Sequence, residues 1–577
     1  MQPNERNART RQLIAIAISC LLVACNGAVE NINVSDAAAS CAEEKAVLVP
    51  NTGEYSRSVN TGSRQAQAFF DQGLRLTYSY YFPEALASFD AALCFDPDNP
   101  MIHWGRALAI APNPNSRYGR APDDPMGAGK AAIAQAKAKA QGLEPVVVAL
   151  IDALAVLFDT DHYPRQADRS QAFIEATQEL IDQYPADLEA AFLAADAIMM
   201  ASPWNYFSQD DGSPIGLAGD ALAILEQGME RNPNHPGLNH LHIHLLENSH
   251  EPERAEVSAD RLESLTPRAG HMVHMPGHIY MRVGRYDDAI TTNERSLAAD
   301  AYFVEQWGDR PLPFGATYGL SARIHGGHAR NFIQWGSLLQ GNSERAITLA
   351  KDMAQSVSQE RLDDGASLRT PAVYIMTLQA FGRWQDILAL PLPPESQPYL
   401  RGIQHAARGS AYLAQDNLAQ DNVAAAESEL AELKSAAANE IVKNQRASVN
   451  AATDLLQIAE YRLQGEIASA RGNFDEAIAA FQAAVVIQDQ LRYMEPPDWM
   501  HSTRLYLGQA YLEAGQYAQA EQVFREDLEL LQENGWALYG LAQTLKAQDK
   551  RQEAESVQDR FEVAWAKADV EIPLPPF

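Results

Sequence analysis

A triplet of small residues recurs along this chain and constrains its fold more than any other feature. Glycine is followed seven residues later by glycine and five residues after that by alanine, at Gly277, Gly284 and Ala289, at Gly465, Gly472 and Ala477, and at Gly508, Gly515 and Ala520. Only such small residues let two helices pack closely at these points. Apolar residues around them recur at i, i+3, i+4 and i+7, and the period-two alternation of strands is absent, so the sequence predicts an all-α fold.

A chain of 577 residues normally divides into several globular domains unless it is built from repeats. The triplets resemble tetratricopeptide units, which are helix pairs of about 34 residues. A unit also fits from Ala66, and the units that begin at Pro236 and Gly270 are 34 residues apart. The resemblance covers most of residues 66–570 and implies a right-handed α-solenoid. We expect its N-terminal part over 61–345 and its C-terminal part over 346–577.

Eight of the fourteen histidines lie within 44 residues, between His235 and His278. His240 and His244 are four residues apart, and His271, His274 and His278 follow a spacing of three and four, so each set lies on one face of a helix. The tetratricopeptide resemblance places these faces in the concave groove. We expect the five imidazoles to converge on one transition metal ion, because neutral imidazole is a common ligand of copper, zinc and iron.

Other residues near these helices extend the predicted site. Met275 and Met281 carry thioethers that suit copper, so copper is expected first, then zinc or iron. His328, from the following unit, is a further candidate ligand. Glu247 is a candidate ligand, outer partner of a histidine or proton acceptor, and Tyr280 is a candidate proton-transfer group.

Some histidines are not expected to bind the metal. His242 lies about 200° around the helix from His240 and His244, so it faces away and is expected to pack or to form hydrogen bonds. His235 and His250 flank the helix as cap or loop residues and are expected to be solvated. The alternative for the other five is a polar groove lining that binds a peptide or carboxylate without metal.

The run from His271 to Tyr286 also resembles a subgroup of bacterial secreted tetratricopeptide proteins. Residues 103–115 and 202–207 resemble further blocks of that subgroup. A second histidine is usual there where this chain has Asn331. Pro276 is expected to bend the helix between His274 and His278, because proline removes a backbone hydrogen bond.

The N-terminus reads as an export signal. Arg6, Arg9 and Arg11 precede a largely apolar run of twelve residues, Leu13 to Ala24, which is too short to span a bilayer. The run ends in a sequence that resembles the lipobox of bacterial lipoproteins, so residues 1–25 are expected to be a signal peptide and Cys25 the lipid anchor. An ordinary cleaved signal is the alternative. Asn26 and Gly27 favour the outer membrane over inner-membrane retention, and residues 26–60 are expected to form a flexible tether.

The net charge argues against one class of partner, and the cysteine content allows one disulfide. The formal net charge is −30, which argues against nucleic acid as a partner. Cys41 and Cys94 can pair in an oxidising periplasm, but the sequence leaves open whether they do.

Three functions remain open from the sequence. The first is a metalloenzyme, either a copper- or iron-dependent oxidising enzyme or a zinc-dependent hydrolase. The second is a cell-envelope scaffold that binds a peptide, protein or small molecule in the groove, with aromatic anchors such as Trp204, Tyr206 and Trp335. The third is a periplasmic metal carrier. The sequence contains no nucleophile elbow, no P-loop, no dinucleotide fingerprint and no HExxH motif.

Overall fold

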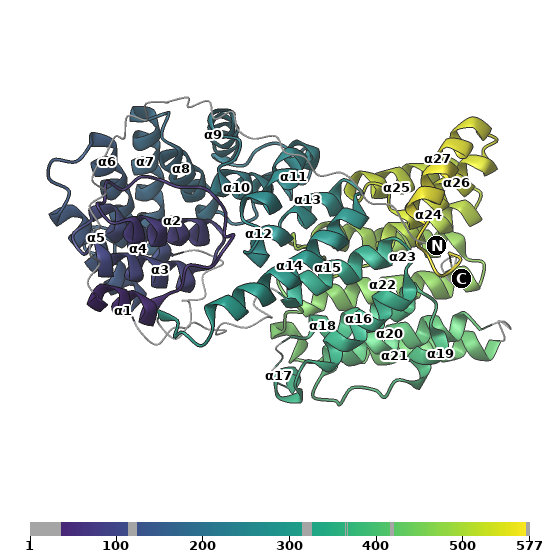
Figure 1. Ribbon diagram of the computed structural model, residues 1–577. Coiled ribbons are helices and arrows are strands. Elements are labelled where there is room, and N and C mark those ends of the chain that lie inside the picture. Colours follow the sequence, from purple (N-terminus) through teal and green to yellow (C-terminus); the bar gives the residue numbers. More distant parts are fainter. Residues whose placement is uncertain are drawn as a thin grey trace, which may run out of the picture.

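The computed structural model describes residues 36–112, 124–313, 326–363, 365, 367–415 and 420–572. All regular structure in these ranges is helical, apart from two isolated β-bridges. Successive helices pack against one another along the chain, from α1 at the purple end to α27 at the yellow end (Figure 1). The predicted all-α solenoid is therefore confirmed. In the described part of the chain, helices long and apolar enough to cross a membrane are absent.

The N-terminal helices form one end of the solenoid in Figure 1. They are α1 (Asp36–Lys45), α2 (Arg64–Tyr78), α3 (Phe82–Phe95), α4 (Pro100–Ile110), α5 (Pro125–Ala138), α6 (Pro145–Ala155), α7 (Gln166–Gln183), α8 (Leu188–Ala201) and α9 (Ala218–Arg231). The middle of the chain forms α10 (Pro236–Leu246), α11 (Glu256–Leu265), α12 (Gly270–His274), α13 (Pro276–Arg282), α14 (Tyr286–Trp307) and α15 (Gly326–Leu339).

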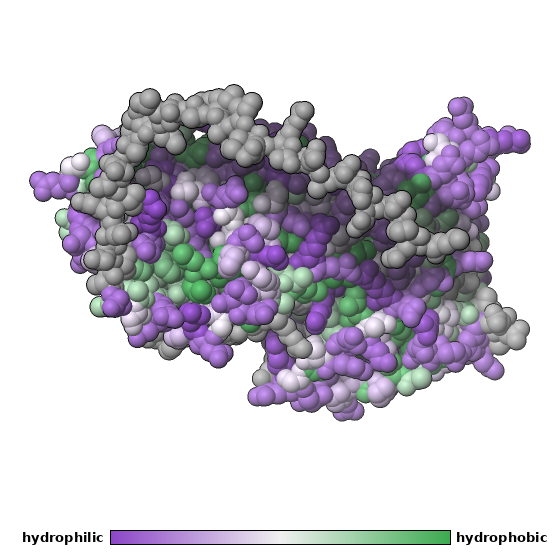
Figure 2. Space-filling model, in the orientation of Figure 1, coloured by the Kyte–Doolittle hydropathy of each residue, from purple (hydrophilic) through white to green (hydrophobic). Residues whose placement is uncertain are grey.

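The C-terminal helices complete the solenoid. They are α16 (Ser343–Gln355), α17 (Gln359–Asp363), α18 (Arg369–Ala380), α19 (Trp384–Ala389), α20 (Pro398–Leu413), α21 (Gln420–Ala437), α22 (Ala452–Ala470), α23 (Phe474–Asp489), α24 (Thr503–Glu513), α25 (Tyr517–Leu530), α26 (Gly535–Ala547) and α27 (Arg551–Ala564). The face of the molecule drawn in Figure 2 is mostly hydrophilic, with apolar patches between the polar residues.

Small residues hold the helix pairs together, as the repeat pattern predicts. A Cβ atom added to Gly465 on α22 would lie 2.5 Å from the ring of Phe481 on α23. The same relation holds between Gly508 on α24 and Phe524 on α25, at 2.6 Å. An aromatic ring on the second helix of each pair thus packs on a glycine of the first, and a larger residue there would force the helices apart.

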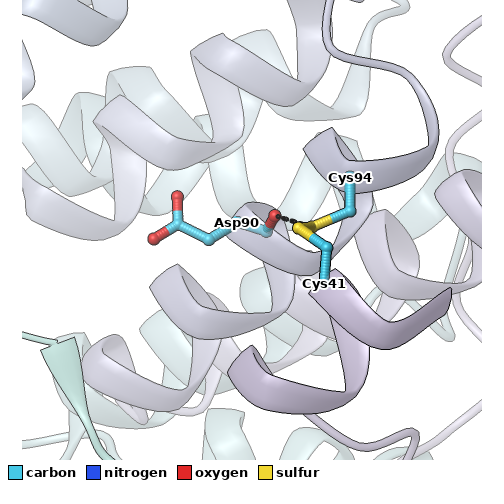
Figure 3. The surroundings of a disulfide bond; sticks show 3 residues. All are labelled: Cys41, Asp90 and Cys94. Carbon is cyan, nitrogen blue, oxygen red and sulfur yellow. Dashed lines mark hydrogen bonds between the residues drawn. A yellow bond between two sulfur atoms is a disulfide. The ribbon is translucent and has the colours of Figure 1, made fainter. Parts of the chain in front are cut away.

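Residues 36–60 are not a flexible tether, so the prediction of a tether over 26–60 is wrong for this part. Helix α1 is joined to α3 by a disulfide between Cys41 and Cys94 (Figure 3), with 5.9 Å between their Cα atoms. Val49 is buried, and its N–H donates to Gln72 Oε1 on α2 at 2.7 Å. The segment buries apolar side chains against the body, which outweighs its polar composition. Residues 26–35 of the predicted tether lie outside the described ranges, as do the signal peptide and Cys25.

The C-terminal helices pack back onto the middle of the solenoid. The Tyr286 hydroxyl at the start of α14 donates to the carbonyl oxygen of Gln532 at 2.6 Å. Trp536 on α26 donates from its indole N–H to the carbonyl oxygen of Leu338 on α15 at 3.0 Å. The superhelix therefore brings Gln532 and Trp536 against helices that lie 246 and 198 residues earlier in the chain.

Candidate metal centre

Helix α10 carries the first two histidines of the centre. It begins at Pro236, where proline suits the first helical position, and His235 caps it by accepting the N–H of Leu238 at Nδ1, 3.1 Å away. His240 and His244 lie one turn apart on this helix and are buried. The Nδ1 atom of His240 lies 2.6 Å from the carbonyl oxygen of Tyr78. Because a carbonyl only accepts, this nitrogen carries the proton and Nε2 keeps a lone pair.

Helices α12 and α13 carry three more histidines. The helix is interrupted at Met275 because Pro276 has no N–H, as expected from the sequence. The Nδ1 atom of His274 lies 2.6 Å from Asn293 Oδ1 on α14. The amide nitrogen of Asn293 donates to the carbonyl oxygen of Ala289 at 2.7 Å, which fixes the orientation of the amide. His274 therefore donates from Nδ1 and also presents Nε2 as the nitrogen with a lone pair.

Two carboxylates hold the last histidine of α13. The Nδ1 atom of His278 lies 2.9 Å from Glu495 Oε2 and 3.1 Å from Glu247 Oε2. The other oxygen of Glu247 accepts the indole N–H of Trp204 at 2.7 Å and lies 3.4 Å from Nδ1 of His244. Both carboxylates are buried. Glu247 thus contacts the Nδ1 side of two histidines, at the place of an outer partner.

The nitrogens opposite these contacts converge in two places. The Nε2 atoms of His240 and His271 are 3.1 Å apart, and those of His274 and His278 are 3.0 Å apart. We call His240, His244 and His271 the first histidine group and His274, His278 and His328 the second, because the ligand atoms within each set lie within 4.8 Å of one another. The structure thus brings together all six histidines that the sequence proposes as ligands.

One nitrogen of the first group lacks a partner among the described residues. Nε2 of His244 is buried and forms no hydrogen bond with them. An unsatisfied buried nitrogen costs roughly 1–3 kcal/mol. Nε2 of His235 and Nε2 of His242 are also buried without a hydrogen bond to the described residues, so the feature by itself does not mark a ligand. Metal-binding histidines characteristically donate one ring nitrogen to a carboxylate or carbonyl and use the other as ligand. His240, His244, His274 and His278 all have this arrangement, so the donor set fits a transition metal.

Burial and neighbouring charges determine the protonation of the cluster. Burial, with the nearby His244 and His278, holds the pKa of His240 well below its usual value, so His240 is neutral. Burial also lowers the pKa of His278, but Glu247 and Glu495 outweigh it and the net shift is upward. The pKa of Glu247 is lowered, since His278 and His244 outweigh the effect of its burial.

A tyrosine from the N-terminal part covers the first histidine group. The ring of Tyr80 lies 4.5 Å from that of His240, 5.2 Å from that of His271 and 5.8 Å from that of His244, centroid to centroid. Tyr80 follows α2 with φ of 58°, a left-handed conformation that is uncommon outside glycine. The turn between α2 and α3 therefore forms one wall of the centre.

Several predicted residues lie elsewhere. The hydroxyl of Tyr280 donates to Asp260 on α11 at 2.9 Å, and Tyr280 belongs to neither histidine group. Met275 and Met281, on which the expected order of metals depends, are buried in the hydrophobic core. His242 faces away, as expected, with Nδ1 2.9 Å from the hydroxyl of Ser258. His235 is a cap residue, as expected, but it is fully buried rather than solvated.

The sequence interpretation missed residues that come from distant repeats. Glu495 is 217 residues from His278, in the loop between α23 and α24, and the hydroxyl of Tyr493 donates to it at 2.8 Å. Asn293 was also missed. The sequence contains a signal for Asn293, because it is a polar residue three residues after Ile290 on the buried face of its helix. The segment around Glu495 contains no comparable signal.

Comparison with known proteins does not assign this chain to a family. No family model matches it, and none of the curated proteins is similar to it in sequence. Among solved structures, human IFIT1 in its dimer with m7Gppp-AAAA is 12% identical, over 93% of this chain and 96% of that one, with a TM-score of 0.31. A chain of the APC/C hetero-tetramer Cut9-Hcn1 is 13% identical over 87% and 88%, with a TM-score of 0.25. Yeast Tom70 is 10% identical over 87% and 91%, with a TM-score of 0.29. Similarities this distant give no information about function. The evidence for function is therefore the geometry of the histidine cluster.

Proposed function

We propose that this protein binds a transition metal through the histidines of α10, α12, α13 and α15, and that it acts as an exported, lipid-anchored metalloprotein. The observation that carries the proposal is the shared orientation of the imidazoles. Four of them direct Nδ1 to a carbonyl, amide or carboxylate oxygen, and the opposite nitrogens converge. The facing Nε2 atoms, 3.0–3.1 Å apart, lie at hydrogen-bond distance, which is also close to the separation of two nitrogens bound to one ion.

The donor set restricts the metal. Imidazole nitrogen suits copper, zinc and iron, and we keep the order copper, then zinc or iron. The methionines that favoured copper lie in the core, so this order now depends on the metals' affinity for nitrogen ligands, which is highest for copper. Such an ion supplies Lewis-acid or redox chemistry when bound.

A metalloenzyme is favoured over a closed carrier by the access to the cluster. Three histidine ligands leave a fourth position for water or substrate in a four-coordinate centre. His328 is only partly buried, so the second histidine group reaches solvent at this residue, whereas the other five histidines are buried. Oxidation with copper or iron and hydrolysis with zinc are the two reaction classes that this centre would support.

Export and anchoring are proposed from the N-terminal sequence. The apolar run and Cys25 lie outside the described residues, so the evidence is the arginine-rich start and the lipobox resemblance. The disulfide between Cys41 and Cys94 is consistent with an oxidising compartment such as the periplasm. We place the protein on the periplasmic face of the cell envelope, at the outer membrane.

Metal content tests the proposal. The full chain and a His274→Ala/His278→Ala variant are purified after growth in supplemented medium, and both are analysed for copper, zinc and iron. The wild type should carry metal and the variant should carry clearly less, with helicity by circular dichroism unchanged. His242→Ala is the matched control, because His242 is buried on the opposite face of α10 and should leave metal content unchanged. If wild type lacks metal after supplementation, the proposal fails and a groove scaffold becomes the better account.

A further inference from the structure

The two histidine groups are separate sets of ligands. Within the first, Nε2 of His240 and Nε2 of His271 are 3.1 Å apart, and within the second, Nε2 of His274 and Nε2 of His278 are 3.0 Å apart. Two nitrogens on one tetrahedral ion, at about 2.05 Å from it, lie about 3.3 Å from each other. One pair of nitrogens in each group is therefore already spaced like two ligands of one ion, and the third histidine of each group offers a nitrogen within 4.8 Å of that pair.

A single ion cannot use both groups as they stand. Two nitrogens bound to the same ion lie at most about 4.1 Å apart, twice the metal–nitrogen distance. Among the described residues, three sets of potential ligand atoms lie within 4.8 Å of one another, and each contains three members: the two histidine groups, and a set of Glu247, His278 and Glu495 that shares His278 with the second group. A set of four or more histidines is not found there. At this spacing the six histidines cannot all be ligands of one ion, and they form two sets of three.

The groups are neighbours. Across them, the ring centroids of His244 and His278 are 6.3 Å apart and those of His271 and His274 are 6.1 Å apart. His271 and His274 lie in one turn of α12, so the backbone fixes their separation. Two ions in these groups would share one cavity, as metals do in two-metal centres.

A carboxylate joins the outer sides of the two groups. Glu247 Oε1 lies 3.4 Å from Nδ1 of His244, and Glu247 Oε2 lies 3.1 Å from Nδ1 of His278. Glu495 adds a second buried carboxyl group, with Oε2 at 2.9 Å from Nδ1 of His278. Two cations in an interior need such counter-charges, because uncompensated buried charge is costly.

We infer that the cluster is a binuclear centre that binds two transition metal ions, one in each histidine group. This inference rests on the proposed metal-binding function and states its stoichiometry and ligand assignment. His240, His244 and His271 hold one ion, and His274, His278 and His328 hold the other. Glu247 is a positioning residue for both ions.

Stoichiometry of reloading tests the inference. The purified full chain is stripped with a chelator and titrated with Cu²⁺, and bound copper per chain is measured after desalting. Wild type should bind two ions. His240→Ala/His244→Ala and His274→Ala/His328→Ala should each bind one, and the control His242→Ala should bind two. If alanine prevents folding, His244→Gln and His328→Gln give the same comparison with one ligand changed in each group.

The outcomes separate the two proposals. Electron paramagnetic resonance of the wild type should show coupled Cu²⁺ spins, and each double variant should show an isolated Cu²⁺ signal. One ion per chain in wild type, lost in both double variants, would overturn the binuclear inference and leave the metal-binding function intact. Two ions with an uncoupled spectrum would overturn the assignment to neighbouring groups. No bound copper, zinc or iron would overturn the proposed function itself.

Discussion

Removing the amide that orients His274 should weaken metal binding without touching a ligand. In Asn293→Ala, Nδ1 of His274 loses the oxygen that accepts its proton at 2.6 Å. The imidazole can then rotate, which turns Nε2 away from the Nε2 of His278, or it can carry its proton on Nε2, which removes the lone pair that a metal needs. Loss of such an outer partner typically reduces metal affinity by about 10–100-fold, equivalent to about 1.4–2.7 kcal/mol.

The measurement is a competition titration of the stripped protein against a chromophoric chelator, with Zn²⁺ and Cu²⁺ as probes. Thr292→Val is the matched control. Thr292 is the neighbouring residue on α14, and its hydroxyl donates to the carbonyl oxygen of Val273 at 2.5 Å, but it is not part of the histidine groups. Both variants lose a buried hydrogen bond and should be destabilised by roughly 1–3 kcal/mol. Only Asn293→Ala should bind metal more weakly.

Two results would refute this reasoning. A folded Asn293→Ala protein with wild-type affinity would show that the amide does not orient the ligand. An equal loss in both variants would show that affinity follows the stability of α14 rather than the hydrogen bond to His274.

Three further predictions concern packing, pH and localisation. Gly277→Leu should reduce the free energy of unfolding by roughly 1–3 kcal/mol, because a Cβ there would lie 2.6 Å from Nδ2 of Asn293. Chemical denaturation measures this change, and an unchanged midpoint would contradict the prediction. Burial raises the pKa of Asp196 to about 7, so its carboxyl is protonated when folded and ionised when unfolded between about pH 4 and 7. Stability should therefore fall by roughly 4 kcal/mol as pH rises through this window, and Asp196→Asn should flatten that dependence in denaturation curves taken at several pH values. Cys25→Ser should release the protein from membranes or block its processing, and unchanged membrane association on fractionation would contradict the lipid anchor.

Local periodicity made most of the fold predictable. The spacing of Gly277, Gly284 and Ala289 gave the helix pair that contains α13 and α14, and the same spacing gave α22–α25. The turn of the helix likewise placed His240 with His244, and His274 with His278, on common faces. These inferences succeed because the α-helix has a fixed pitch, so residues three or four apart meet regardless of what lies around them.

Burial of the N-terminal segment was not predictable in this way. Residues 36–60 are small and polar in composition, yet Val49 and Val59 are buried and Tyr55 donates its hydroxyl to Glu189 at 2.6 Å. The composition of a segment indicates only whether that segment would be ordered in isolation. Whether it packs depends on the surface that the rest of the chain offers to it.

By itself, the sequence determined the helical repeat, the faces of the helices that carry histidines and the ligand chemistry that follows from imidazole. Only the tertiary structure decided that the histidines divide into two groups, that Tyr80 and Glu495 complete their surroundings, and that His278 lies between two carboxylates. The physical reason is the superhelix. Each repeat adds a small rotation set by its own packing, and the sum over many repeats determines which distant residues meet. A local sequence pattern determines the helix pair within one repeat, but it carries almost no information about the summed rotation.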